Sequence, residues 1–341
     1  MSLILGIEST CDETGAAIVK DGRVVQSNVV ASQVALHERY RGVVPEIASR
    51  AHIENILPVI RESLTSAGYE FTDLDAIAVA HRPGLIGSLF IGVTTAKTLA
   101  WSLAKPLIGV DHVHAHLYSV VLDSDVHPEF PAVGVVVSGG HTALYDVKSW
   151  TEIELIGSTI DDAVGEAYDK VSAILGLGYP GGPVIDRLAQ EGVANAIRFP
   201  RSLLGRESLD FSFSGLKTAV LYHVRGVPGR DDPPIDLNDQ SLRNIAASFQ
   251  AACVDTLLTK MKRALRHTRG RSVIVGGGVS ANSGLRNALP SLGVPIYLPT
   301  FAYCTDNAAM TAGLAHVLFE RRRFSDLDLD AITSSQFAFR K

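Results

Sequence analysis

The chain has 341 residues, of which 46% are hydrophobic and 20% charged, so it is long enough for two hydrophobic cores. Its formal net charge of −5 excludes a protein that binds nucleic acid through an overall basic surface, because phosphate contacts dominate such binding. For a nucleic-acid substrate, the basic surface would have to be local or be supplied by a partner.

The N-terminus and the cysteines indicate a cytoplasmic protein. The stretch MSLILGIEST has no basic region and no small-residue cleavage site, so we expect no signal peptide. The longest uncharged stretch, residues 83–96, is too short and too glycine-rich to span a bilayer. A reducing compartment, without a disulfide framework, is also indicated by three cysteines that show no CxxC spacing: Cys11, Cys253 and Cys304.

Two segments share one pattern of strands and turns. Residues 3–30 alternate strand, polar turn, strand, charged turn and strand, and residues 132–157 repeat this pattern with a Gly-Gly turn. Helical periodicity follows each of them, over 45–67 and over 161–178. The repetition predicts two related α/β lobes that face a cleft.

The hexapeptide DHVHAH contains an aspartate and three of the chain's 11 histidines. If Asp111 caps a helix, His112 and His116 stand at i and i+4 on one face, a spacing that suits two ligands of one metal ion. His114 would then point about 160° away from them. A third ligand could come from Asp306, which precedes a helix of small residues. From the spacing alone, a metal site and a packed, hydrogen-bonded histidine pair both remain open.

The C-terminal half contains three further features. Residues 225–239 combine charge, glycine and proline without periodicity, which predicts a surface loop before a long helix that begins near Ser241. The basic stretch 260–271 is amphipathic, and a solvated helix face is favoured over an RNA-binding patch. Residues 272–290 predict a strand, a Gly-Gly-Gly turn and a helix, where the glycines serve either the tight turn itself or a bound phosphate.

Eight stretches together are specific to one family, although no single glycine motif is. In chain order they are GIESTCDETG, GVVPEIASRAHIENI, HVHAH, VVSGGHT, GEAYDKVSAILGLGYPGGP, FSFSGLKTA, GGGVSAN and TDNAAM. The chain thereby resembles the universal tRNA threonylcarbamoyl-adenosine transferase family, of the bacterial TsaD type, from residue 5 to about residue 310. One departure is AHRPGLIGS, where the family usually has a Gly-Pro-Gly turn, and it leaves the role of residues 81–83 open.

The resemblance implies an α/β protein with a two-lobed actin-like, sugar-kinase-like (ASKHA) fold, in which two duplicated lobes of β-meander and helices surround a central cleft. We expect residues 1–110 to form the N-terminal lobe, with residues 311–341 packing back on it. Residues 111–310 would form the C-terminal lobe, which would carry the metal and most nucleotide contacts.

The resemblance also implies the residues of the site. The implied metal ligands are His112, His116 and Asp306, which would hold one divalent ion per chain. The resemblance favours iron (Fe²⁺), and zinc remains possible because a set of two histidines and an aspartate suits both. The implied substrate-binding residues are Val136, Val137, Ser138, Gly139, Gly140, Asp169, Gly182, Asp186 and Asn282.

The implied reaction moves a threonylcarbamoyl group from threonylcarbamoyl-AMP to the exocyclic amine of the adenosine adjacent to the tRNA anticodon. The implied partners are tRNA, the adenylate, a paralogous subunit of the TsaB type and a small ATPase of the TsaE type, with no membrane. Asp12 and Glu13 are candidate acid/base or orienting groups, and Asp169 and Asp186 suit ribose hydroxyls. Alternatively, Glu13 caps a turn and Asp186 is a helix N-terminal residue.

Three other functions compete with this interpretation. A metalloprotease of the zincin type needs a glutamate directly after the first histidine, where this chain has Val113. An ATPase or kinase of the same fold would hold Mg²⁺ through carboxylates and water, and not through imidazoles. A nucleotide-binding scaffold without catalysis would keep the phosphate-binding turns, and only an assay separates it from the enzyme.

Overall fold

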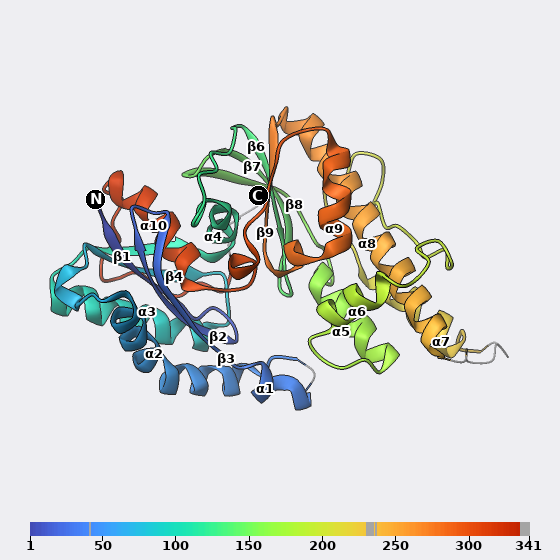
Figure 1. The fold of residues 1–341 in the computed structure, drawn as a ribbon, viewed down its shortest axis with the longest axis horizontal. Coiled ribbons are helices and arrows are strands. Elements are labelled where there is room, and N and C mark those ends of the chain that lie inside the picture. The colour runs from blue at the N-terminus through green and yellow to red at the C-terminus, as the bar shows by residue number, and fades with distance from the viewer. Residues whose placement is uncertain (41, 230–234, 236, 335–341) are drawn as a thin grey trace. The chain divides into compact units, whose positions relative to one another are not determined.

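The fold comprises two compact α/β units in a computed structural model that describes residues 1–40, 42–229, 235 and 237–334 (Figure 1). The first unit contains Met1–His127 and the chain from Pro299 onward, and the second contains Pro128–Leu298. The predicted surface loop over 225–239 lies partly outside the described residues.

The first unit is built on a five-stranded sheet in the order β3-β2-β1-β4-β5. Its strands are β1 (Leu3–Glu8), β2 (Glu13–Lys20), β3 (Val24–Ser32), β4 (Ala76–Arg82) and β5 (Leu107–Asp111). Its α-helices are α1 (Val34–His37), α2 (Pro45–Ala67), α3 (Ile86–Leu103), α4 (His112–Tyr118) and α10 (Ala308–Glu320). β1 pairs antiparallel with β2 and parallel with β4, so the first three strands form the predicted meander.

Successive residues of β1 face opposite sides of the sheet, and helices pack on both sides. The odd-numbered residues share a hydrophobic cluster with α2 and α3: Leu3, Leu5 and Ile7. Gly6 and Glu8 point to the opposite face, because successive strand residues face opposite sides. There, a Cβ atom added to Gly6 would lie 2.4 Å from the carbonyl oxygen of Ala308, and Glu8 accepts a hydrogen bond from Thr311. α10 therefore packs directly on the backbone of β1.

The second unit repeats this sheet. Its strands are β6 (Ala132–Val137), β7 (Thr142–Ser149), β8 (Glu152–Ser158), β9 (Ser272–Gly276) and β10 (Ile296–Tyr297), in the order β10-β9-β6-β7-β8. β6 pairs antiparallel with β7 and parallel with β9, as β1 pairs with β2 and β4. The two sheets thus have one topology with the same strand senses, which confirms the prediction of two related lobes.

The helices of the second unit cover a core that begins at β6. They are α5 (Val164–Leu175), α6 (Gly181–Ala189), α7 (Ser214–Arg225), α8 (Asp239–Thr268) and α9 (Ser283–Ala288). One face of β6 packs in a single cluster with large apolar side chains of α5 and α8, among them Tyr168 and Phe249, whose rings lie 5.0 Å apart edge to face. The predicted helix near Ser241 and the strand–turn–helix over 272–290 are confirmed.

The boundaries of the units differ from the predicted lobes, 1–110 and 111–310. α4 follows β5 of the first sheet without a break and packs against α10, where Gly313 lies against Tyr118. His112, His116 and Asp306 consequently belong to the first unit. The sequence placed them in the second lobe because the packing of α4 against a helix almost 200 residues later leaves no local signal.

One helix, α3, is long and apolar enough to cross a membrane by length and composition alone. It packs on β4 and α2, and Ser9 donates a hydrogen bond to the carbonyl oxygen of Ser88 within it. Its buried residues include Leu89, Val93 and Ala96. Core helices pass the same test, so this feature is weak evidence for a membrane segment.

The close contact between β1 and α10 predicts a large effect of Gly6→Ala. The added methyl group must displace backbone atoms of Ala308 and Ala312, so we expect a loss of about 3 kcal/mol in the free energy of unfolding, measured by urea denaturation. Gly215→Ala in α7 is the control, because a Cβ atom there meets nothing within 4 Å. It should be neutral or stabilise by about 0.5 kcal/mol. Equal midpoints for the two variants would contradict the packing described here.

Candidate metal centre and nucleotide site

The helix that carries the histidines begins where the sequence predicts. The carboxylate of Asp111 accepts hydrogen bonds from the backbone N–H groups of Val113 and His114, which caps the N-terminus of α4. Arg82 in the unusual turn donates to the same carboxylate at 3.1 Å. Arg82 belongs to residues 81–83, whose role the sequence left open. It thus helps to hold Asp111, the residue that caps α4.

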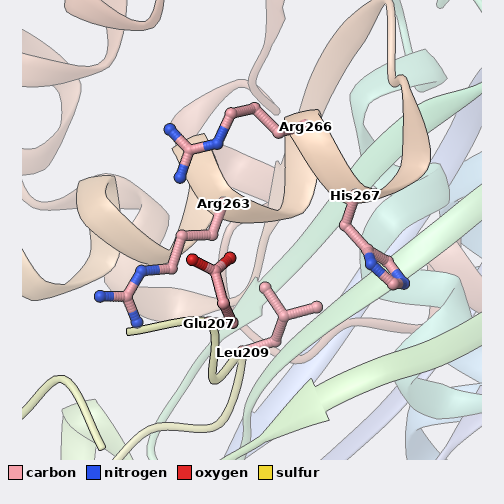
Figure 2. A pocket seen from close by; sticks show the side chains of 5 residues that line it. All are labelled: Glu207, Leu209, Arg263, Arg266 and His267. Carbon is pink, nitrogen blue, oxygen red and sulfur yellow. The ribbon is translucent and has the colours of Figure 1, made fainter. Parts of the chain in front are cut away.

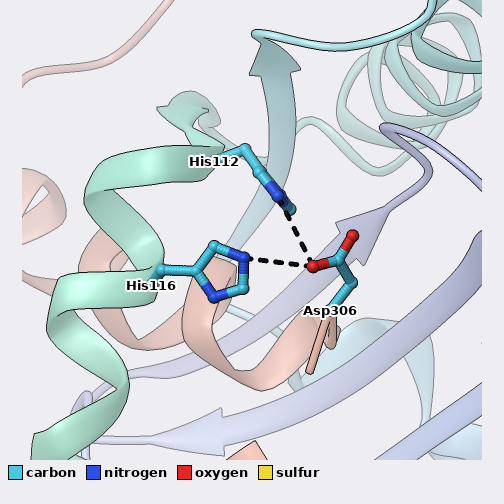
Figure 3. A group of neighbouring side chains, drawn as sticks. All are labelled: His112, His116 and Asp306. Carbon is cyan, nitrogen blue, oxygen red and sulfur yellow. Dashed lines mark hydrogen bonds and ion pairs between the residues drawn. The ribbon is translucent and has the colours of Figure 1, made fainter. Parts of the chain in front are cut away.

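His112, His116 and Asp306 converge on one point (Figure 3). The Nε2 atom of His116 lies 3.0 Å from Oδ1 of Asp306, and the Nε2 atom of His112 lies 3.6 Å from the same oxygen. Both imidazoles are buried, and their rings meet edge to face at 4.7 Å. His114 lies outside this group, as the helical spacing predicts.

The three residues fit a metal ion by donor type and by spacing. One ligand atom from each lies within 4.8 Å of the others. Around a tetrahedral ion with bonds of about 2.1 Å, neighbouring ligand atoms are about 3.4 Å apart, close to the separations of 3.0 and 3.6 Å from the Asp306 oxygen. Two imidazoles and one carboxylate are ligands that both iron and zinc accept.

Glu8, which the sequence analysis missed, orients His112. This fully buried carboxylate lies 3.0 Å from Nδ1 of His112 and also accepts hydrogen bonds from the backbone of Thr10 and the hydroxyl of Thr311. Burial alone would lower the pKa of His112, but the charges of Glu8 and Asp306 raise it to about 9. A carboxylate on the second nitrogen is the usual partner of a metal-bound histidine, and a charged residue in an otherwise apolar strand was the signal for it.

Asp12 ends the turn between β1 and β2, and Glu13 is the first residue of β2; both lie in the same unit as the histidines. Burial, followed by the negative charges of Asp306 and Asp12, raises the pKa of Glu13 to about 9. Burial and the same carboxylates also raise the pKa of the Cys11 thiol. The turn therefore brings further acidic groups close to Asp306, an arrangement that a bound cation would stabilise.

In the second unit, the predicted phosphate turn connects β6 to β7. Val136 and Val137 are fully buried strand residues, so only their backbone could meet a ligand. The hydroxyl of Ser138 accepts a hydrogen bond from the backbone of His141, which closes the turn. At Gly139 and Gly140, by contrast, a Cβ atom would meet nothing within 4 Å. The open part of the turn is therefore its two glycines.

Gly165, in the first turn of α5, fits closely against this turn. A Cβ atom on Gly165 would lie 2.6 Å from the carbonyl oxygen of Ser138, and the Gly165 amide donates to that oxygen. One turn later on α5, the carboxylate of Asp169 accepts a hydrogen bond of 2.7 Å from the amide of Gly181, the first residue of α6. The neighbouring Gly182 has open space around it. α5 thus connects the predicted positions Ser138, through Gly165, and Asp169 with Gly181, which precedes the predicted Gly182.

Asp186 and Asn282 meet in a polar network with Gln250, which the sequence analysis missed. The carboxylate of Asp186 accepts hydrogen bonds from the side chains of Gln250 and Asn282 and from both the backbone and the hydroxyl of Ser283. Asn282 caps α9 by accepting from the amide of Leu285. The alternative interpretation of Asp186, as a helix N-terminal residue, is wrong: Asp186 lies inside α6, and its carboxylate accepts a hydrogen bond from the backbone of Ser283, the first residue of α9.

The glycine turn after β9 also has a structural reason. Gly277 has a φ angle of +90°, and a Cβ atom there would lie 2.5 Å from the carbonyl oxygen of Val137. This glycine is required by the packing of β9 against β6, whether or not a phosphate binds.

Two solved structures are similar to the chain as a whole. HypF from T. kodakarensis matches with a TM-score of 0.60 and 15% identity, over 96% of this chain and 49% of that chain. The (R)-2-hydroxyglutaryl-CoA dehydratase component A of Acidaminococcus fermentans matches with a TM-score of 0.54 and 15% identity, over 95% of this chain and all of that chain. At such identities the likeness shows the fold alone. With the two matching sheets, it identifies an α/β protein of the two-lobed actin-like class, as predicted.

The sequence relatives identify the family. Residues 24–313 match the family model described as TsaD: tRNA N6-adenosine threonylcarbamoyltransferase. The tRNA N6-adenosine threonylcarbamoyltransferase of Moorella thermoacetica is 51% identical over 96% of this chain and 95% of its own length. That of Symbiobacterium thermophilum is 50% identical over 97% of this chain and 95% of its own length. The chain therefore belongs to this family of tRNA-modifying transferases, which confirms the predicted family and enzyme class.

The network around Asp186 predicts a cost in stability. Asp186→Ala removes the acceptor of the Gln250 amide and one of the two acceptors of the Asn282 amide, and it leaves the Ser283 hydroxyl without its acceptor, so the free energy of unfolding should fall by about 3 kcal/mol. Asp255→Ala, which removes an exposed ion pair with Arg201, is the control and should cost less than about 1 kcal/mol. Urea denaturation measures both. An Asp186→Ala protein as stable as the control would show that the network does not support the fold.

Proposed function

We propose that this chain transfers a threonylcarbamoyl group from threonylcarbamoyl-AMP to the exocyclic amine of the adenosine adjacent to the tRNA anticodon. A divalent metal ion, iron or zinc, assists the reaction. The observation that carries this proposal is the convergence of His112, His116 and Asp306 in a member of the transferase family. A protease is disfavoured, because the position that needs a general base is the buried Val113.

The described residues can position the two reactants of this reaction and stabilise charge. The donor is an activated mixed anhydride, so the enzyme needs to position two reactants and to stabilise charge, without a covalent nucleophile. The open backbone at Gly139 and Gly140 suits an anionic group of the adenylate, a phosphate or the threonyl carboxylate. Asp169 is the better candidate for a ribose hydroxyl, because Asp186 already accepts hydrogen bonds from three neighbouring residues.

His112, His116 and Asp306 would hold the metal ion, with Glu8 keeping the imidazole of His112 in place through its Nδ1 atom. When bound, the ion supplies a Lewis acid for a phosphate or carbamoyl oxygen. Asp12 would orient the adenine amine or accept its proton. Glu13, whose pKa burial and nearby carboxylates raise to about 9, would act as a neutral hydrogen-bond donor at neutral pH until a cation lowers that pKa.

The proposed partners include a paralogous subunit of the TsaB type and a small ATPase of the TsaE type, in the cytoplasm. The outer face of α2 and α3 is a candidate surface for the paralogue. It exposes Ile53 and Leu57 one turn apart on α2 and Phe90 on α3, each more than half exposed. A paralogue of the same fold would present an equivalent helix pair, so the two pairs could bury each other's apolar faces. With its net charge of −5, the isolated chain should bind tRNA only weakly.

The direct test is modification of unmodified tRNA by the purified chain, with and without both partners, from supplied threonylcarbamoyl-AMP. Mass spectrometry of the digested tRNA should reveal the modified adenosine next to the anticodon. No modification with all partners and the adenylate present would contradict the proposal.

The metal assignment predicts the metal content of single variants. His112→Ala, His116→Ala and Asp306→Ala should each lose most of the bound metal while remaining folded, because each removes one of the three proposed protein ligands. His114→Ala should keep its metal. Glu8→Ala should lower metal affinity about 10- to 100-fold, and Glu8→Gln less, since the amide oxygen can still accept from Nδ1.

Elemental analysis with circular dichroism measures these outcomes. Full metal content in a folded protein that carries both His112→Ala and His116→Ala would show that the ion is held elsewhere.

The position of Asp12 and Glu13 close to Asp306 predicts that their replacement lowers the turnover rate. Asp12→Asn or Glu13→Gln should lower turnover about ten- to a thousand-fold, as for a lost acid/base group or orienting hydrogen bond. Adenylate affinity and the thermal midpoint should stay near wild type, because the replacements preserve size and most acceptors. Single-turnover rates at saturating tRNA and adenylate measure the effect. Wild-type rates in both variants would leave catalysis to the metal ligands and the backbone turns.

A further inference from the structure

The last turns of α8 form a basic surface on an acidic chain. Nine of the chain's 31 lysines and arginines lie in two short segments, three in residues 198–206 and six in residues 260–271, and neither segment contains an aspartate or a glutamate. Lys262, Arg266 and Arg269 are exposed and stand at i, i+4 and i+7, so they form one stripe on the helix.

The two segments are bound to each other. Lys260 is buried, and its Nζ atom donates to the carbonyl oxygens of Leu203 and Ser208 at 2.8 and 2.7 Å. Arg263, one turn closer to the stripe, donates to the same two carbonyls and to that of Gly205. The loop that carries the exposed Arg206 is therefore held against α8 by five hydrogen bonds from two cationic side chains.

A pocket of about 220 Å³ lies where loop and helix meet (Figure 2). Three of its five lining residues are Arg263, Arg266 and His267 of α8, and one, Glu207, is acidic. Figure 2 shows the side chains of Arg263 and Arg266 projecting from the helix, with the guanidinium group of Arg263 nearer to the loop that carries Glu207. The pocket is thus lined by three basic side chains, of which Arg263 is held in place by hydrogen bonds to the loop.

The exposed cations of this surface lack acidic partners in the described part of the chain. Arg201 pairs with Asp255, and Arg271 lies 3.8 Å from Glu129. Among the described residues, no ion pair involves Lys262, Arg266 or Arg269. Basic residues near a helix C-terminus interact favourably with the helix dipole, but that effect falls off within the last turn, and Lys262 lies more than one turn before the end of α8.

We propose that this surface, comprising Arg206, Lys262, Arg263, Arg266 and Arg269, binds the phosphate backbone of tRNA. The inference rests on the proposed function for the identity of the RNA. Guanidinium groups contact phosphate through paired hydrogen bonds, and contacts to the backbone place an RNA without reading its sequence. A local basic surface of this kind reconciles a tRNA substrate with the net charge of −5.

The test compares two triple variants that remove the same charge. The first carries Arg206→Gln, Lys262→Gln and Arg266→Gln, all exposed positions outside the hydrogen bonds that hold the loop. The control carries Arg225→Gln, Arg322→Gln and Arg323→Gln, three exposed arginines from outside the two basic segments. Both have a net charge three units more negative, so a difference between them reports on position and not on total charge.

The dissociation constant for unmodified tRNA is measured for the full chain, alone and with its partner subunits, from low to physiological salt. Each lost phosphate contact lowers the slope of log K against log salt by about 0.7 to 0.9, so the first variant should lose about two units of slope. Its dissociation constant at low salt should rise at least about ten-fold. Its turnover at saturating tRNA should stay within about two-fold of wild type, while its KM for tRNA rises. The control should match wild type.

Three results would overturn the proposal. The first is wild-type tRNA binding and salt slope in the first triple variant. The second is an equal loss in the control. The third is loss of partner assembly in size-exclusion chromatography with unchanged tRNA binding, which would make the surface a protein interface. If wild-type protein bound tRNA but transferred no threonylcarbamoyl group, the proposed function would fail while the binding comparison still decided this surface. Arg266→Gln alone, expected to lose about one unit of slope, serves if the triple variant does not fold.

Discussion

The candidate metal centre depends on the close packing of α10 against β1 and β2. Two glycines make this possible: Gly6 faces the backbone of Ala308 and Ala312, and Gly15 faces the start of α10. Because no side chain intervenes, the residues just before α10 reach the carboxyl end of the first sheet. Asp306 there meets two histidines almost 200 residues earlier in the chain. The small residues of α10 thus serve the site through the packing that they allow.

The same face of β1 also places a charge inside the first unit. Glu8 has no access to solvent. Its buried carboxylate is stabilised by hydrogen bonds with His112, Thr10 and Thr311. A buried carboxylate is costly unless it is paired, so this arrangement fixes the rotamer of His112 before any ion arrives. The nearby Asp12 and Asp306 add negative charge that a divalent cation would balance, and this charge helps to raise the pKa of Glu13. The electrostatics and the donor set therefore support the same proposal.

Local patterns predicted much of the fold. The two meanders, the helix over Pro45–Ala67 and the cap at Asp111 were predictable because turns, proline at a helix start and capping side chains act within a few residues. The unit boundaries, the orientation of His112 by Glu8 and the hydrogen-bond partners of Asp186 were not predictable, because each arises from packing between distant segments. The only sequence signal for Glu8 was an acidic residue in an otherwise apolar strand. No sequence signal indicated the role of Gln250. The histidine pair was suggested by its spacing, but the full set of site residues came from the family resemblance, and the structure adds the side chains that contact them.

The central claim is that the two imidazoles and the Asp306 carboxylate bind one divalent ion. X-ray absorption at the metal edge of the purified protein tests it most directly, because the spectrum reports both the element and its ligands. The account predicts iron or zinc surrounded by nitrogen and oxygen donors, with the multiple-scattering signal of two imidazoles at a metal–nitrogen distance of about 2.0 to 2.1 Å for zinc. A sulfur donor at about 2.3 Å, or a shell without imidazole scattering, would contradict it.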